Sequence, residues 1–494
     1  MKPKNTETTR YLCAAAYSNE EFCQHVIDQT LEEKRQALAP CYGFHLPTVV
    51  KHCLIARSKR KKRDLKLTLL FAAAILVSSM GGFIGTFFLV ALFIVVISIT
   101  YQDRWNTRHV LMKDNFSSVA FDPESINWEN ELKSKGSDAS EENTEEIQKI
   151  RRKLEQVAQE QNSKIVIYGR YSPFVGCGYD IGGWSLALNV SKGKEKLGKI
   201  STPLPFEINE LYEKVTCLIS EIHLYGIDVS TEDIYYIDGQ IIRDDVRFLN
   251  SPFDRPSTCL EILEASIEEP AKANRFYKRI QLLGWRGELI VSIVLRFTRF
   301  GGNLFVEAKY FLLPPLQESF HGIDRIQSPA TFMQKADLLW QSLVISFFLW
   351  PLAFSQTIYE VLKPVIDTIK QWIDILVIKE NPIFNYGSIT SIRENVSNTR
   401  YRQYFQFLDQ DMYFKVIESA LLEGIVDFLD SKNVDTSELK NRQSQILNEG
   451  IIISGGEINA KNLAVGRRAR AIFNKRKAKT IEQSRRESSK ANSK

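Results

Sequence analysis

The feature that most constrains this chain is an uncharged stretch at residues 67–100. Its 34 residues, LTLLFAAAILVSSMGGFIGTFFLVALFIVVISIT, contain no Asp, Glu, Lys or Arg. An apolar run of 18 or more residues is typical of a membrane-spanning helix, because a helix satisfies its own backbone hydrogen bonds in hydrocarbon. As one straight helix the run would be roughly 51 Å long, against about 30 Å of hydrocarbon. Gly81 and Gly82 lie near its middle and favour a turn, so we predict a helical hairpin with arms at 65–80 and 83–99.

Basic residues flank the apolar run on both sides. Residues 57–63 read RSKRKKR, and further arginines follow the run. Lys and Arg concentrate on the cytoplasmic side of membrane proteins, so two basic flanks predict that both ends of the hairpin are cytoplasmic. The first flank could also be a nucleic-acid or nuclear-targeting patch, but its position beside an apolar run favours anionic lipid head groups. The flanking residues expected at the head groups are Lys59, Arg60, Lys61, Lys62, Arg63, Arg104 and Arg108.

Changes in composition divide the 494 residues into eight segments. We predict a small helical cytoplasmic domain at 1–64, a transmembrane hairpin at 65–100, a juxtamembrane linker and helix at 101–163, an α+β soluble domain at 164–330, a second apolar region at 331–380, a helical domain at 381–450, a β-arc at 451–466 and a basic tail at 467–494. The predicted fold class is α+β. It combines a helical membrane hairpin, a β-rich antiparallel soluble domain and a helical C-terminal region that ends in the short β-arc.

The soluble α+β domain is expected to contain an antiparallel sheet. Asp238-Gly239 predicts a tight hairpin turn, and Gly301-Gly302-Asn303 predicts a second one. Strands are predicted at 165–168, 184–190, 234–237, 240–242, 277–283, 288–297 and 304–312.

Before this domain, apolar side chains recur at helical spacing in a segment of mixed charge. They are Ile147, Ile150, Leu154 and Val157. Fewer than three heptads favour an amphipathic helix on a neighbouring domain, with a short coiled-coil contact as the alternative.

A second uncharged run covers residues 338–359, with Pro351 inside it, and an amphipathic helix is expected at 361–376. The tail at 466–494 contains eleven Lys/Arg and two Glu, a net charge of +9 that favours the cytoplasm. Together with a hairpin, a cytoplasmic tail requires an even number of crossings. We therefore predict an interfacial or partly inserted element. A third crossing is the alternative, and it would require an exported tail or a first run that crosses only once.

The richest glycine segment, GRYSPFVGCGYDIGG, lies at 169–183. Its spacing misses G-x-G-x-x-G by one residue, and a strand pattern follows where the dinucleotide mechanism needs a helix. A structural loop between strands is therefore favoured over a ligand loop. If the chain binds a ligand, the expected contacts are Gly176, Gly178, Gly182, Gly183, Arg170, Tyr171 and Trp184.

Cysteine chemistry finds little support in the residue spacing. A nucleophilic Cys177 would need a base, and only His223 and His321 lie in the same domain. The Cys and His residues of the N-terminal domain are types that bind zinc, but they form no C-x-x-C or H-x-x-x-H pair. Seven cysteines at irregular spacings favour free thiols in a reducing compartment. We predict no catalytic residues, no metal and no cofactor.

Three stretches together resemble a known family. They are TRYLCAAAYSNEEFCQHVI with APCYGFHLPTVVKHCL, YSPFVGCGYDIGGWSLAL, and FNYGSITSIRE through FLDSKNVDTSELKNRQSQILNEGIIISGG. They resemble an uncharacterised family of bacterial membrane proteins with an N-terminal helical domain, a membrane hairpin and cytoplasmic α+β domains. The resemblance implies a bacterial membrane protein but no known activity. Separately, INAKNLAVGRRARA is similar to the β-roll repeats of trimeric bacterial adhesin heads, which hints at self-association.

These features predict a membrane-tethered, non-enzymatic sensor, scaffold or effector of a bacterial inner (plasma) membrane, with cytoplasmic soluble domains. The expected partners are the lipid bilayer, anionic head groups and further copies of the chain in a homo-oligomer. Nucleic acid is not expected, because Phe473 is the only aromatic residue of the basic tail. Two alternatives stay open. One is a membrane-anchored enzyme or ligand-binding protein with its site at residues 169–184, and the other is an oligomeric pore-former that assembles through Gly81, Gly82 and Gly85.

Overall fold

The structure is a computed structural model. It describes residues 6–79, 81–111, 116, 121–122, 127–132, 141–196, 199–222, 226–257, 274–326, 330–399 and 401–448. The chain divides into two compact units. Unit 1 comprises Met1–Asp180, Thr216–Arg296 and Tyr310–Phe414, and unit 2 comprises Ile181–Val215, Phe297–Lys309 and Lys415–Lys494. The predicted β-arc at 451–466, the basic tail at 467–494 and His223 lie outside the described residues.

Unit 1 begins with a group of helices, called the helical domain below. Helix α1 (Glu7–Ser18) is followed by α2 (Glu20–Ile27) and by a π-helical turn, η1 (Asp28–Glu32). The side chain of Asn19 accepts a hydrogen bond from the Phe22 amide, which is how an N-cap satisfies an orphan donor. Side chains of these helices form one apolar core with the start of α3 (Leu46–Ser78).

The amphipathic helix predicted after the linker is α7 (Glu141–Gln161). Leu154 and Val157 are buried in the core of the helical domain, and Ile147 and Ile150 pack against it half-buried. The apolar face of α7 is therefore used within the chain.

Helices α3 and α4 (Gly82–Trp105) form the predicted hairpin. Helix α3 runs without a break from the helical domain into the first arm. Gly81 and Gly82 have φ angles of 61° and 68°, which residues with a Cβ rarely adopt, so the chain turns at the predicted position. A π-helical segment, η2 (Asn106–Leu111), and a short helix, α6 (Trp128–Leu132), follow.

The main sheet has six strands in the order β1-β5-β6-β7-β8-β2. They are β1 (Ile165–Tyr168), β2 (Tyr179–Asn189), β5 (Asp228–Asp238), β6 (Asn274–Gly284), β7 (Leu289–Phe300) and β8 (Asn303–Leu313). β5 and β6 are antiparallel, but β1 and β5 are parallel, with Ile165 opposite Tyr235. The sheet is mixed, so the prediction of a purely antiparallel domain is wrong. The connection from β1 to β5 is long and includes α8 (Ile208–Ser220), and such a crossover allows two paired strands to run in the same direction.

The hairpin predicted at Asp238-Gly239 is also wrong, since β5 ends at Asp238 and residues 240–242 form no strand. Gly239 serves a close backbone approach instead. A Cβ there would lie 2.2 Å from the amide nitrogen of Gly387. The turn predicted between β7 and β8 is confirmed, with Gly301 at a φ of 59°.

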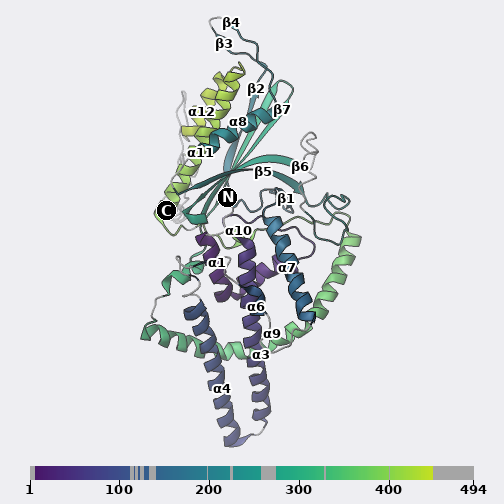
Figure 1. Ribbon diagram of the computed structural model, residues 1–494, viewed down its shortest axis with the longest axis vertical. Helices are drawn as coiled ribbons and strands as arrows, with labels where there is room; N and C mark the ends of the chain where they lie inside the picture. The colour runs from purple at the N-terminus through teal and green to yellow at the C-terminus, as the bar shows by residue number, and fades with distance from the viewer. Residues whose placement is uncertain are drawn as a thin grey trace, which may run out of the picture. The chain divides into compact units, whose positions relative to one another are not determined.

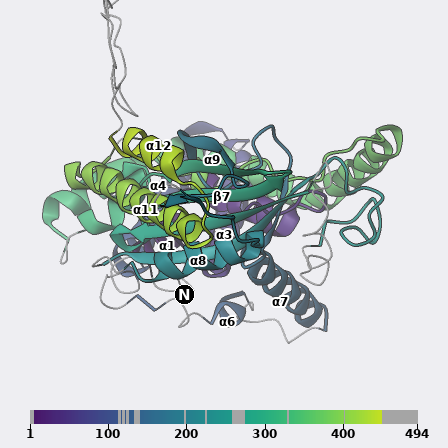
Figure 2. The same ribbon diagram turned by 90° about the horizontal axis from the view of Figure 1, so that it is seen from above.

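The second apolar run and the amphipathic segment after it form one helix of 49 residues, α9 (Phe332–Glu380). It begins with a capping box of Thr331 and Gln334, and it contains Pro351 and Pro364. In Figure 1 the two hairpin arms lie side by side, and α9 runs across them instead of alongside. Figure 2 shows the view from above, in which the end of α9 in light green is visible at the right.

Three helices follow α9 in the chain. They are α10 (Ile392–Asn395), α11 (Tyr404–Ser431) and α12 (Ser437–Asn448). Unit 2 also contains a small ladder of β3 (Glu195–Lys196) and β4 (Lys199–Ile200).

Candidate membrane-contact surface

The two hairpin arms are joined at their charged base. The guanidinium of Arg63 on α3 lies 2.8 Å from Asp64 and 3.2 Å from Asp103 on α4. Next to this contact, Arg104 donates a hydrogen bond to Gln341 of α9 at 3.3 Å. The charged ends of both arms therefore lie at the same end of the hairpin, and the turn lies at the other.

Helix α9 packs on both arms part-way along the hairpin. Leu67 of α3, Val96 of α4 and Ala353 of α9 form a small buried cluster. The indole N–H of Trp350 donates to the Leu67 carbonyl at 3.2 Å, and the Thr68 hydroxyl donates to the Ala353 carbonyl at 3.1 Å. These contacts fix the level at which α9 crosses the hairpin.

Beyond these contacts, the three helices expose a large apolar surface. The exposed side chains on the hairpin are Leu65, Leu69, Ile75, Leu76, Phe83, Ile84, Phe87, Phe88, Val90, Ile94 and Val95. Those on α9 include Trp340, Phe347, Phe348, Leu352, Val361, Leu362, Val365, Ile369, Trp372 and Ile373. A contiguous apolar surface of this kind marks a contact with a membrane or another protein.

The second half of α9 separates charge from apolar side chains. Its charged residues recur every three or four positions and line a cleft; they are Glu360, Lys363, Asp367, Lys370 and Asp374. Its exposed apolar residues fall between them, which places them on another face of the helix. A helix with one charged face and one apolar face suits the boundary between lipid and water.

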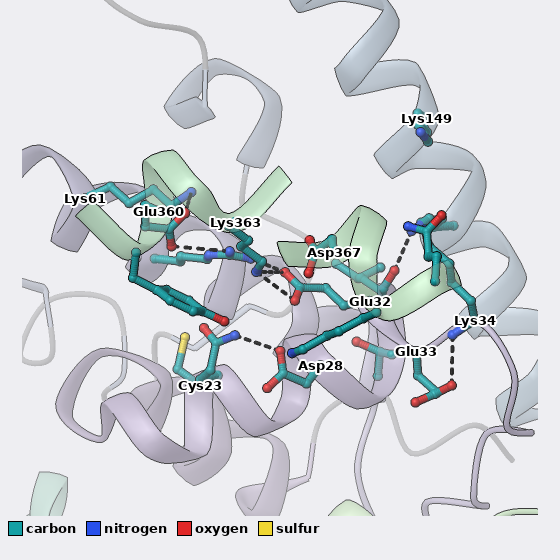
Figure 3. Close-up of a pocket in the computed structure, with 18 of the residues that line it drawn as sticks. Cys23, Asp28, Glu32, Glu33, Lys34, Lys61, Lys149, Glu360, Lys363 and Asp367 are labelled. Carbon is teal, nitrogen blue, oxygen red and sulfur yellow. Dashed lines mark hydrogen bonds and ion pairs between the residues drawn. The ribbon is translucent and has the colours of Figure 1, made fainter. Parts of the chain in front are cut away.

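Figure 3 shows the charged cleft, which has a volume of about 1480 Å³. Helices α2, α3, α7 and α9 contribute to its wall. At its centre, Lys363 of α9 donates to both carboxylate oxygens of Glu32 at 2.7 and 2.8 Å, and Arg57 of α3 contacts the same carboxylate at 2.7 Å. Glu360 accepts from Lys61 at 2.7 Å and lies 3.5 Å from Arg57. These ion pairs join α9 to the helical domain.

Electrostatics differ between the centre and the α7 end of the cleft. Burial alone would raise the pKa of Glu32, but the hydrogen bonds from Lys363 and Arg57 outweigh it and lower the pKa to about 2. At the α7 end, burial lowers the pKa of Lys153, and the neighbouring cations Lys149 and Lys34 lower it further. The charge of Glu32 at the centre is therefore balanced by Lys363 and Arg57, whereas Lys153, Lys149 and Lys34 lie near one another at the α7 end.

Some of the predicted membrane-flanking residues contact other parts of the chain, and others are exposed. Arg63, Arg60 and Lys61 have partners within the chain: Arg63 pairs as above, Arg60 donates to the Ala16 carbonyl at 2.6 Å, and Lys61 pairs with Glu360. Lys59 lies 3.8 Å from Glu131, and Arg104 contacts Gln341. Lys62 and Arg108 are exposed. Part of this basic run therefore holds the helices together.

The glycine-rich loop already holds a carboxylate of the chain itself. The amides of Gly176 and Gly178 donate to one oxygen of Glu394 at 2.8 and 3.0 Å, and the Ser391 amide donates to its other oxygen at 3.0 Å. A Cβ at Gly178 would lie 2.3 Å from the Leu312 carbonyl oxygen. These contacts support a structural role for the loop over a ligand-binding one.

The remaining candidate ligand contacts are distributed over both units. In unit 1, Tyr171 and Arg170 are exposed. In unit 2, a Cβ at Gly182 would meet no atom within 4 Å, a Cβ at Gly183 would lie 2.2 Å from the Ala308 carbonyl oxygen, and Trp184 donates to the buried Glu418 at 3.2 Å. None of these residues lines the charged cleft at Glu32.

The thiol of Cys177 lies in an apolar core between strands. Burial raises its pKa to about 11, which opposes formation of the reactive thiolate. His321 instead contacts Glu288 at 3.2 Å. Over the described ranges, six cysteines are free and no group of three or more His, Cys, Asp or Glu side chains is placed to hold a metal ion.

A family model for the AbeC-like domain matches residues 183–459, more than half of the 494 residues. The chain belongs to this family. The AbeC-like domain includes α9, α11 and α12, whereas the hairpin and most of the glycine-rich loop precede it. No curated protein and no solved structure matches the chain.

Two groups of contacts were not predicted from the sequence. One is the cluster around Glu32 and Lys363, and the other is the insertion of Glu394 into the glycine-rich loop. The spacing of charged residues on α9 could have indicated its polar face. No local pattern indicates that Glu394 contacts the glycine-rich loop, because it is 218 positions from Gly176.

Proposed function

We propose that this chain is a membrane-tethered, non-enzymatic scaffold, sensor or effector on the cytoplasmic face of a bacterial inner membrane. The hairpin and α9 are its membrane-contact surface. The observation that carries the proposal is the exposure of the most apolar segments. Among the described residues, two helical stretches are long and apolar enough to cross a membrane, Gly82–Arg108 and Phe332–Glu380, and only 11% and 22% of their most apolar windows are buried. A core helix of a soluble protein would be mostly buried.

Tethering is supported further by the position of the charges. The ion pairs around Glu32 face the cleft, and most of the exposed apolar side chains in the second half of α9 do not line it; Tyr359 and Val361 are at its edge. Burying that apolar face in lipid would leave the charged face in water or against protein, which is the stable arrangement for an interfacial helix. The soluble parts of the chain would then stay on one side of the membrane.

Flotation with phospholipid vesicles tests the proposal. Phe87 on α4 is 65% exposed, so an aspartate at this position should not disturb the fold. A charged side chain in the bilayer centre costs about 2.5–3.5 kcal/mol, so Phe87→Asp should lower the ratio of vesicle-bound to free protein by about 100-fold. Tyr171→Asp is the matched control, since Tyr171 is fully exposed but lies outside the three helices.

Equal flotation of both variants and the wild-type chain would contradict the proposal. Absence of wild-type flotation would contradict it as well. Circular dichroism of each variant in detergent checks that the helices are intact.

A further inference from the structure

The first arm of the hairpin is short for a membrane crossing. After Lys66, α3 has 12 uncharged residues, at 67–78, followed by its C-cap Ser79 before the turn. This is about 20 Å of helix, against about 30 Å of hydrocarbon. The second arm is longer, but the arms are joined at Arg63 and Asp103, so the shorter arm limits how deep the turn can reach.

Helix α9 also limits the depth. It is bonded to the hairpin at Leu67 and Thr68, at the start of the apolar part of α3. Sliding the hairpin deeper would carry α9 with it and would bring Glu360, Lys363 and Asp367 towards the hydrocarbon. Each charged group that reached the bilayer centre would cost about 2.5–3.5 kcal/mol.

The turn itself satisfies backbone groups with its own side chains. The hydroxyl of Ser78 donates to the Ile75 carbonyl at 2.6 Å, and that of Ser79 donates to the Leu76 carbonyl at 2.6 Å. Both carbonyls lie in the last turn of α3, and the Leu76 carbonyl also accepts from the Ser79 amide at 3.3 Å, so few backbone groups are left unsatisfied at the turn. Ser220 and Ser431 make the same kind of bond at the ends of α8 and α11, so these contacts permit a turn in hydrocarbon but do not require one. In hydrocarbon each unsatisfied group costs several kcal/mol.

From the length of the first arm and its attachment to α9 we infer that the hairpin is re-entrant: its turn ends inside the hydrocarbon and does not reach the opposite face of the bilayer. The inference rests on the proposed membrane tethering and adds the depth. The occupant of the exposed hairpin surface is lipid acyl chain on all sides of the turn. The charged base at Arg63 and Asp103 lies at the head groups of the face from which the hairpin enters.

Cysteine labelling in vesicles tests this depth. The full-length chain is added to preformed phosphatidylethanolamine and phosphatidylglycerol vesicles, with Phe83→Cys reporting the turn and Lys66→Cys reporting the base. Both positions are exposed in the structure, with Phe83 at 85%. A membrane-impermeant maleimide is supplied either outside the vesicles or trapped inside them, and the wild-type chain gives the background from native cysteines. Labelling after detergent is added shows that each new thiol is reactive.

The re-entrant hairpin predicts that Lys66→Cys is labelled only by the reagent outside the vesicles. Phe83→Cys should be protected from both reagents, with a labelling rate at least 10-fold lower than in detergent. Labelling of Phe83→Cys by the trapped reagent would show a complete crossing and overturn this inference while leaving the tether intact. Labelling of Phe83→Cys from outside would show that the hairpin does not insert, and would overturn both the inference and the proposed function.

Discussion

The ion pairs around Glu32 should hold α9 against the helical domain, and Glu32→Gln tests this directly. The carboxylate accepts hydrogen bonds from Lys363 and Arg57, which lower its pKa from 4.5 to about 2. That difference corresponds to at most about 3 kcal/mol. Because 34% of the Glu32 side chain is exposed, solvent screening reduces the expected effect to about 1–2 kcal/mol. Local opening of α9 from the cleft should therefore become about 5- to 30-fold more frequent.

Hydrogen exchange followed by mass spectrometry, on the full-length chain in lipid nanodiscs, measures this opening. Peptides covering 360–376 should exchange faster in Glu32→Gln. Glu33→Gln is the matched control, because the Glu33 carboxylate accepts from the amides of Lys34, Arg35 and Gln36 and contacts no cation of α9. Equal exchange in the two variants would refute the reasoning.

The same contact has a defined pH dependence. Since the folded pKa of Glu32 is below the ordinary value of 4.5, its contribution is present above pH 4.5 and is lost as the pH falls towards 2. Wild-type exchange in this segment, corrected for the intrinsic pH dependence of exchange, should approach that of Glu32→Gln over this range. An unchanged difference between the two proteins at pH 3 would contradict the assignment.

Two further predictions concern the stability of the fold. Gly178→Ala should destabilise the chain by more than Gly182→Ala. Both glycines have a positive φ, but only a Cβ at Gly178 would lie 2.3 Å from the Leu312 carbonyl oxygen. Equal midpoints of thermal unfolding for the two variants would contradict this. Burial lowers the pKa of His52 to about 3, with smaller contributions from neighbouring lysines, so stability is complete above pH 6.5 and should fall by about 2 kcal/mol between pH 6.5 and 5. His52→Gln keeps a polar partner for Tyr17 and should remove this slope in urea unfolding, whereas an equal slope in both proteins would exclude His52 as its cause.

Local patterns were sufficient to predict the helices near the apolar segment. An uncharged run with two adjacent glycines predicts a helical hairpin whatever the rest of the chain does, because helices satisfy the backbone hydrogen bonds of so long an apolar segment. The amphipathic α7 follows from the spacing of its apolar residues in the same way. The second half of α9 was also predictable, but its union with residues 338–359 was not, since Pro351 usually ends or kinks a helix.

Contacts between distant residues could not be read from the sequence. The pairing of Lys363 with Glu32 joins positions 331 apart, and no local pattern encodes such a partner. The parallel pairing of β1 with β5 likewise depends on the path of a long connection. Asp238-Gly239 shows the limit most clearly, because the glycine that looked like a hairpin turn is required by the close approach of Gly387.

The most direct test of the account is to identify the side chains that touch lipid. The full-length chain would be reconstituted with a phospholipid that carries a photoactivatable group in its acyl chain, and cross-linked residues would be mapped by mass spectrometry. The account predicts cross-links at Phe87 and Ile94 of the hairpin and at Trp372 of α9, but not at Lys370 in the cleft or at the exposed Tyr171. Cross-links distributed equally over Tyr171 and the hairpin, or absent from the hairpin, would contradict it.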